Sequence, residues 1–212
     1  MDITQLLNSS LGQQVINGIG KQAGTGEKDT ASVINASLPV IMGMLQKNAN
    51  SPDESKNLMK ALDQHDGGIL NNLSSFLSSG DTQDGSKILD HILGDKKDTA
   101  IKAISKQTNV SSENVSKIIA LVAPIIMGYL GQQKKGKKVE SGNGLSDLIG
   151  SLAGGTDAAS IGGSILSTVL NQKGGNAGNL LNDILGSVTD GGKGKKKNSG
   201  LGNVLGNLFG KK

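Results

Sequence analysis

The sequence predicts an all-α fold, a multihelical bundle, and three observations support that prediction. Apolar residues recur at helical spacing through the first 133 residues, and no segment there alternates as a strand does. Phe76, Tyr129 and Phe209 are the only aromatic residues in the chain, so aromatic residues, which favour sheets, are scarce. One pattern of about forty residues also occurs twice, which indicates an internal duplication of helices.

The duplication is clearest in two apolar segments, 39–45 and 124–130, which lie 85 positions apart. Extending the same offset gives two copies over about 6–45 and 91–130. The matching positions that define the motif are Pro39 and Pro124, Met42 and Met127, and Gly43 and Gly128.

Capping and turn residues divide the first 133 residues into helices. A hydroxyl or carboxylate caps free N–H groups, Pro fits the first helical turn, and Gly ends a helix in a left-handed conformation. These signals place helices from Asp2 to the turn at 24–26, from Asp29 or Thr30 to Leu45, from Ser51-Pro52 to Gly67-Gly68, over 69–77, over 88–93, from Asp98 or Thr99 through Ile104, and from Ser111 to Leu130.

Composition changes after residue 133, where the expected core domain, 1–133, gives way to a Gly- and Lys-rich tail, 134–212. The tail holds four short apolar patterns with the spacing of one-sided helices. Each is shorter than the roughly 12–15 residues that an isolated helix needs in water, so we expect these helices to form only where they dock. The patterns are Leu145/Leu148/Ile149/Leu152, Ile161/Ile165/Leu166/Val169, Leu180/Leu181/Ile184/Leu185/Val188 and Leu201/Val204/Leu205/Leu208/Phe209.

Composition also excludes several classes of function. The chain has no Cys, which excludes disulfides, thiol nucleophiles and thiolate metal sites. All 22 basic residues are Lys, and without the planar fork of Arg we expect no sequence-specific binding of nucleic acid. No nucleophile elbow or dinucleotide fingerprint is present, so we expect no enzyme, no catalytic residue and no cofactor.

The sequence predicts a cytoplasmic protein. No basic residue precedes Lys21, so the start lacks the charge pattern of a secretory signal. The longest charge-free apolar stretch, 118–131, is too short to cross a bilayer and is typical of a buried core helix.

Each apolar motif places a Gly four residues after a Pro, within a helical pattern. Pro removes one hydrogen bond and kinks the axis, and the Gly lies on the same face of the helix. One interpretation is that the two kinked helices form a binding groove for a partner. The other is that they allow two core helices to cross closely, and the sequence favours this one because apolar periodic positions indicate packing.

Four residues are candidates for a metal site, because His and Asp both ligate divalent ions. Their spacing matches no metal motif, and Asp is common in caps and turns, so the sequence favours a structural role for them. The candidates are His65, Asp66, Asp84 and His91.

Charge is unevenly divided between the two parts of the chain. Residues 1–133 hold 11 Lys and 13 acidic residues, whereas 134–212 hold 11 Lys and 5 acidic residues. Lys clusters flank the apolar patterns of the tail, an arrangement that suits an anionic membrane surface. The polar faces of those patterns are mostly Asn, Ser and Gly, which favours a soluble tail that docks on the core.

Three stretches together resemble a known family: Leu62-Asp63-Gln64-His65-Asp66-Gly67-Gly68-Ile69-Leu70, Asp84-Gly85-Ser86-Lys87-Ile88-Leu89-Asp90-His91-Ile92-Leu93-Gly94 and Ala123-Pro124-Ile125-Ile126-Met127-Gly128-Tyr129-Leu130. They look like the bacterial YidB-like proteins, also called domain of unknown function 937, over about residues 1–133. Many relatives are similar in ending with Gly- and Leu-rich helical pieces. The resemblance implies a helical, non-membrane bacterial protein without an established activity, and it makes Asp84, Gly85 and His91 positions to mutate.

These observations lead to three hypotheses about function. The leading one is a non-enzymatic interaction or scaffold protein whose tail, including Leu205 and Phe209, docks on the core or on another copy. The second is peripheral binding to an anionic membrane surface through the Lys-flanked tail. The third is a metal-dependent activity around His65 and His91.

Overall fold

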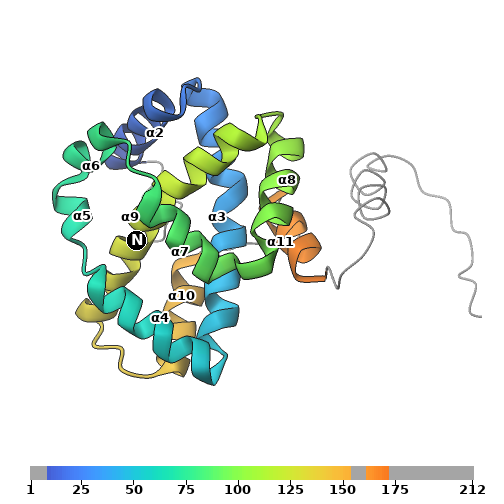
Figure 1. Ribbon diagram of the computed structural model, residues 1–212. Helices are drawn as coiled ribbons and strands as arrows, with labels where there is room; N and C mark the ends of the chain where they lie inside the picture. Colours follow the sequence, from blue (N-terminus) through green and yellow to red (C-terminus); the bar gives the residue numbers. More distant parts are fainter. Residues whose placement is uncertain (1–8, 154–160, 172–212) are drawn as a thin grey trace, which may run out of the picture. The chain divides into compact units, whose positions relative to one another are not determined.

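Figure 1 shows the computed structural model of the chain, which describes residues 9–153 and 161–171. Every regular element in these two ranges is helical, which confirms the all-α prediction. The start expected at Asp2 and the last two apolar patterns of the tail lie outside the described residues. The helices are α2 (Ser10–Ala23), α3 (Glu27–Ala49), α4 (Pro52–Gln64), α5 (Gly68–Asn71), α6 (Leu73–Ser79), α7 (Gln83–Leu93), a 3-10 turn η1 (Gly94–Lys96), α8 (Lys97–Thr108), α9 (Ser112–Gly136), α10 (Gly142–Ala153) and α11 (Ile161–Asn171).

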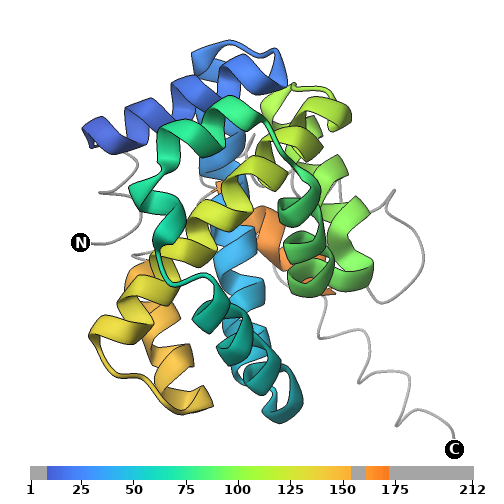
Figure 2. The ribbon, with the colours of Figure 1, turned by 60° about the vertical axis from the view of Figure 1, so that its left-hand side comes forward.

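Two long helices, α3 and α9, cross at the centre of the bundle (Figures 1 and 2). The helices α2, α4, α7 and α8 each pack against both of them. The apolar stretch 118–131 in α9 is buried at every position, as the sequence predicts for a core helix. Its continuous burial explains why α9 shows no polar face over this length.

Helix bounds repeat at the offset found in the sequence. Helix α3 starts at Glu27 and α9 starts at Ser112, 85 positions later. Each follows a turn with a left-handed residue at the same offset, Gly24 with φ 70° and Asn109 with φ 58°. The pairs α2–α3 and α8–α9 therefore share bounds and turn geometry, while a common origin of the two pairs stays a prediction.

Two local expectations differ from the structure. The helix expected over 69–77 is divided at Asn72, whose side-chain amide donates to the carbonyl of Gly68 and so competes with the helical pattern. Helix α3 starts at Glu27, before the expected caps Asp29 and Thr30. The buried Thr30 hydroxyl instead donates to the Gly26 carbonyl within the first turn.

Helices α10 and α11 extend the packed core past the boundary expected at residue 133. Both pack against α3, and the compact unit that contains them runs from Met1 to Lys173. The first two tail patterns supply the contact, because Leu145, Ile149 and Val169 are fully buried. These two patterns are helical where they dock, as short one-sided helices require.

Among the described helices, only α9 is long and apolar enough to be compared with a membrane-spanning helix. Its most apolar window has a mean hydropathy of 1.5, and 83% of that window is buried inside the protein. Burial of that extent is typical of the core helix of a globular unit.

Candidate functional site

A groove of about 200 Å³ lies between α4 and α7, over parts of α3 and α9. Two contacts show that its walls run in opposite directions: His65, after α4, meets Asp84 in the first turn of α7, and Asn48, before α4, bonds to the Ile92 carbonyl near the end of α7. The lining residues are Asn48, Glu54, Asn57, Leu58, Ala61, Gln64, Lys87, Ile88, His91, Ile92 and Met127.

Two glycines allow both walls to lie directly on α9. At Gly85 in α7, a Cβ would overlap the backbone carbonyl of Ala120 in α9. At Gly131 in α9, a Cβ would overlap the carbonyl of His65 and lie 2.6 Å from that of Leu62. Because neither backbone can move aside without moving its helix, only glycine fits these two crossings.

Polar contacts hold the C-terminal end of α4 in place. The Lys134 ammonium, on a side chain that is 10% exposed, pairs with the carboxylate of Asp63. The His65 ring bonds through Nδ1 to the Ala61 carbonyl at 2.8 Å, and its Nε2 lies 3.4 Å from Asp84 Oδ2. The His65–Asp84 contact is an ion pair only when the imidazole is protonated. One end of the groove is therefore closed by a link between its two walls.

The groove has an apolar floor and polar rims. Leu58, Ile88, Ile92 and Met127 form the floor and are buried. The rim side chains, in contrast, are exposed on both walls. The rim of α4 carries Glu54, Asn57 and Gln64, and the rim of α7 carries Lys87 and His91.

Most polar groups of the rims are available for a ligand. Within the described part of the chain, the side chains of Glu54, Asn57, Gln64 and Lys87 make no hydrogen bond or ion pair. The His91 ring uses Nδ1 against the Lys87 carbonyl at 3.0 Å, which leaves Nε2 without a partner there. An apolar floor with a few polar groups above it is the usual composition of a small-molecule site.

The candidate metal ligands do not gather into one site. His65 and Asp84 are in contact, but Asp66 accepts a hydrogen bond from the Gly68 amide in a turn, and His91 lies in the groove. No group of three His, Cys, Asp or Glu residues that could hold a metal occurs in ranges 9–153 and 161–171. The geometry therefore assigns turn and helix-linking roles to Asp66, His65 and Asp84.

The two apolar motifs meet different helices. Gly43 in α3 lies against Leu166 of α11, and Pro39 lies against Gly162 of the same helix. Gly128 in α9 lies against Ile69 of α5. Of the other residues predicted to interact, Met42, Pro124 and Met127 are buried in the described core, and Leu205 and Phe209 lie outside the described residues.

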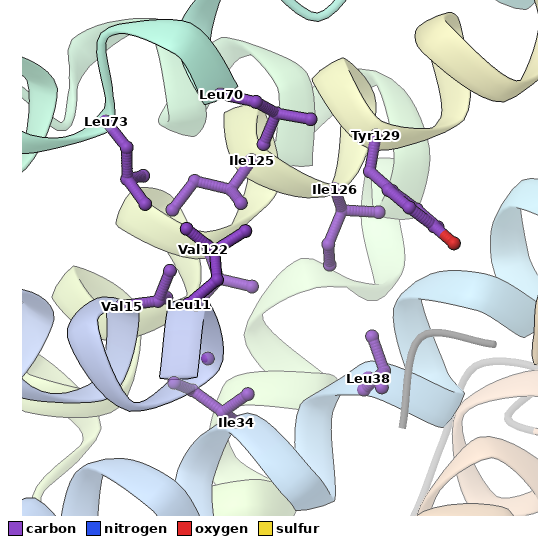
Figure 3. A pocket seen from close by; sticks show the side chains of 11 residues that line it. Leu11, Val15, Ile34, Leu38, Leu70, Leu73, Val122, Ile125, Ile126 and Tyr129 are labelled. Carbon is purple, nitrogen blue, oxygen red and sulfur yellow. The ribbon is translucent and has the colours of Figure 1, made fainter. Parts of the chain in front are cut away.

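Figure 3 shows a second cavity of about 30 Å³, enclosed by α2, α3, α9 and the α5–α6 segment. Val15, Ile34 and Val122 are among the side chains that point into it, and Tyr129 carries the only side-chain polar atom of the lining. The volume corresponds to about one water molecule, and an apolar lining gives a water no partners. The cavity offers no group for catalysis or for binding an ion.

The groove could not be found from sequence patterns alone. The segment 84–94, on which the family resemblance rests, forms one complete wall. The other wall gives no comparable signal, because Glu54, Asn57 and Gln64 resemble the exposed face of any amphipathic helix. Only the Gly85 and Gly131 crossings, which depend on tertiary contacts, bring the two walls together.

The fold and the groove define a helical protein with a binding cleft and without an assembled catalytic centre among its described residues. Residues 5–133 match the family described as "Bacterial protein of unknown function (DUF937)". The chain belongs to this family, as the resemblance implied. No curated protein and no solved structure matches the chain.

Proposed function

We propose that this protein is a non-enzymatic interaction module that binds short, Gly- and Leu-rich amphipathic helices and uses them to self-associate. One observation carries the proposal: α10 and α11, which have the first two tail patterns, both dock on α3. The core therefore already has a surface suited to helices of this kind.

The contact between α3 and α11 explains why such helices fit. Gly162 lies against the Pro39 ring, and Leu166 lies against Gly43. Both pairs are four residues apart, so α11 runs alongside α3 in the same direction. Small residues on each helix let the backbones come close, and one large side chain fills the space above the opposite glycine.

The remaining two patterns, 180–188 and 201–209, have the same spacing and the same neutral polar faces as α10 and α11. We expect them to bind a second copy of the chain, because each is too short to be helical alone. The end of α11 offers a contact, since Leu170 is 43% exposed and is the one large apolar side chain exposed among the described residues. Several weak contacts on one chain combine into a stronger assembly.

Sedimentation velocity over a range of protein concentrations tests this proposal. The double variant Leu205→Ser with Phe209→Ser removes apolar contact from the last pattern. The matched control, Asn203→Ser with Asn207→Ser, changes the polar face of the same segment. We expect concentration-dependent association of the unmodified chain and of the control, and weaker association of the Leu205/Phe209 variant.

Circular dichroism of both variants verifies that the helical unit is intact. An unmodified chain that sediments as a monomer at every concentration would contradict the proposal. Equal association of the two double variants would also contradict it, because the apolar stripe would then play no part.

A further inference from the structure

The α4–α7 groove has the features of a site for a small ligand with an apolar body. Its floor of Leu58, Ile88, Ile92 and Met127 is made of buried apolar side chains that remain at the base of a groove. At about 30 Å³ per water molecule, a volume of about 200 Å³ holds about seven waters. Replacing those waters by hydrocarbon is favourable over such a floor.

The rim of α7 indicates the charge of the ligand. Lys87 and His91 are four residues apart, so they lie on the same face of the helix. The Lys87 ammonium has no ion-pair partner within the described residues, and the bond between His91 Nδ1 and the Lys87 carbonyl leaves Nε2 for a ligand. An ammonium and a protonated imidazole together suit a carboxylate.

The opposite rim determines how such a ligand lies. Gln64 and Asn57 offer side-chain amides, which donate to an oxygen at either end. Glu54 lies ten residues before Gln64, about 15 Å along α4. Its carboxylate disfavours an anion at that end, so the charged group of the ligand belongs toward Lys87.

We propose that the α4–α7 groove binds a small aliphatic carboxylate, with its hydrocarbon chain on the floor and its carboxylate between Lys87 and His91. The available room suits an acid of about six carbons. The site is separate from the α3 surface that holds α10 and α11. Ligand binding and self-association therefore fail or succeed independently.

The two histidines of the chain make a direct test possible, because each gives a separate imidazole signal in a proton NMR spectrum. We expect hexanoate, titrated into the full chain at constant pH and ionic strength, to shift the His91 ring signals with saturation. The His65 ring is the internal control, because both of its nitrogens already have partners. For a ligand of this size we expect a Kd on the order of 1 mM.

Two related probes separate charge from hydrocarbon. Hexanamide keeps the chain and lacks the negative charge, and acetate keeps the charge and lacks most of the chain. We expect both to bind at least about fivefold more weakly than hexanoate, because each loses one of the two contacts. If hexanamide binds as well as hexanoate, the groove does not select a carboxylate and the proposal is overturned.

Three variants complete the test. Lys87→Met keeps an apolar stem and loses the charge, and we expect about fivefold weaker binding of hexanoate. Lys102→Met, on α8 and away from the groove, should leave the Kd unchanged. Glu54→Gln removes the one acidic side chain of the lining, and we expect hexanoate to bind up to about twice as tightly. Absence of any saturable His91 shift, or equal Kd values for Lys87→Met and the unmodified chain, overturns the proposal.

Discussion

Gly43 and Gly128 occupy equivalent positions 85 residues apart, yet different helices cover them. Leu166, from the end of the compact unit, lies on Gly43 in α3. Ile69, from the segment between the two repeated helix pairs, lies on Gly128 in α9. A glycine in a core helix thus marks a place where another helix can approach, and the rest of the chain determines which helix it is.

The comparison separates α3 and α9 by the origin of their neighbours. Helix α9 is enclosed mainly by elements that precede it, including α4, α5 and α7. Helix α3 receives α10 and α11, which follow the family-matched region 5–133. The core of this protein is therefore completed by helices that lie beyond the family match.

The largest effect should come from ending the chain at residue 133. The deletion removes α10 and α11 and exposes the face of α3 beneath them. Each buried Leu, Ile or Val side chain that is lost removes about 1.5–3 kcal/mol of burial, offset in part by the ordering of the two helices. We expect chain 1–133 to be at least about 3 kcal/mol less stable to urea than chain 1–173. Equal midpoints and slopes would show that α3 does not need the two helices.

Next in size is the effect of a side chain at a crossing between backbones. Gly131→Val places a branched side chain against the carbonyls of Leu62 and His65, where no flexible group can move aside. We expect a loss of about 3 kcal/mol or more, or a failure to fold. Gly136→Val in the last turn of the same helix, where a Cβ meets no neighbour, is the matched control. Urea unfolding should place this control within about 1 kcal/mol of the unmodified chain, and similar losses for both variants would contradict the account.

A smaller effect distinguishes the two equivalent glycines directly. Gly43→Ala crowds the Leu166 side chain and Gly128→Ala crowds Ile69, while each change gains up to about 1 kcal/mol of helix propensity. We expect each alanine to couple with its own neighbour by about 1–2 kcal/mol in a double-mutant cycle. Leu166→Ala should relieve only Gly43→Ala, and Ile69→Ala should relieve only Gly128→Ala. Relief of both by one partner would show that the assignment of neighbours is wrong.

The smallest effect concerns an ion pair that α9 has and α3 lacks. A hydrogen bond from Lys117, and then its charge, hold the pKa of Glu113 below its ordinary value of 4.5. At the equivalent positions α3 has Lys28 and Ser32, which do not form such a pair. A lowered carboxyl pKa stabilises the fold above the ordinary value, and this stability is lost as the pH falls through the lowered pKa.

Thermal melts between about pH 3 and pH 6 should show this contribution. We expect Glu113→Gln to flatten the acid side of the profile slightly, and the difference to shrink in high salt because the pair is exposed. Lys28→Gln, at the position in α3 equivalent to Glu113, should leave the shape of the profile unchanged. A profile for Glu113→Gln that is identical to that of the unmodified chain would show that the pair contributes nothing.

Local signals in the sequence predicted most of the helices, and tertiary contacts determined what it could not predict. Ser111 caps α9 through the Asn114 amide, and Gly24 ends α2 in a left-handed conformation, because both effects depend on neighbouring residues alone. The neighbours of Gly43 and Gly128 could not be predicted, since helical periodicity gives the apolar face of a helix but not its partner. The α4–α7 groove was missed for the same reason, because it depends on crossings at Gly85 and Gly131.

The central claim is that the tail patterns beyond the compact unit bring copies of this chain together. Multi-angle light scattering on size-exclusion peaks tests it most directly, with the full chain compared with chain 1–173 at matched concentrations. The account predicts a full chain with at least twice the monomer mass and a monomeric 1–173 chain of intact helicity. A monomeric full chain, or equal association of both chains, would contradict it.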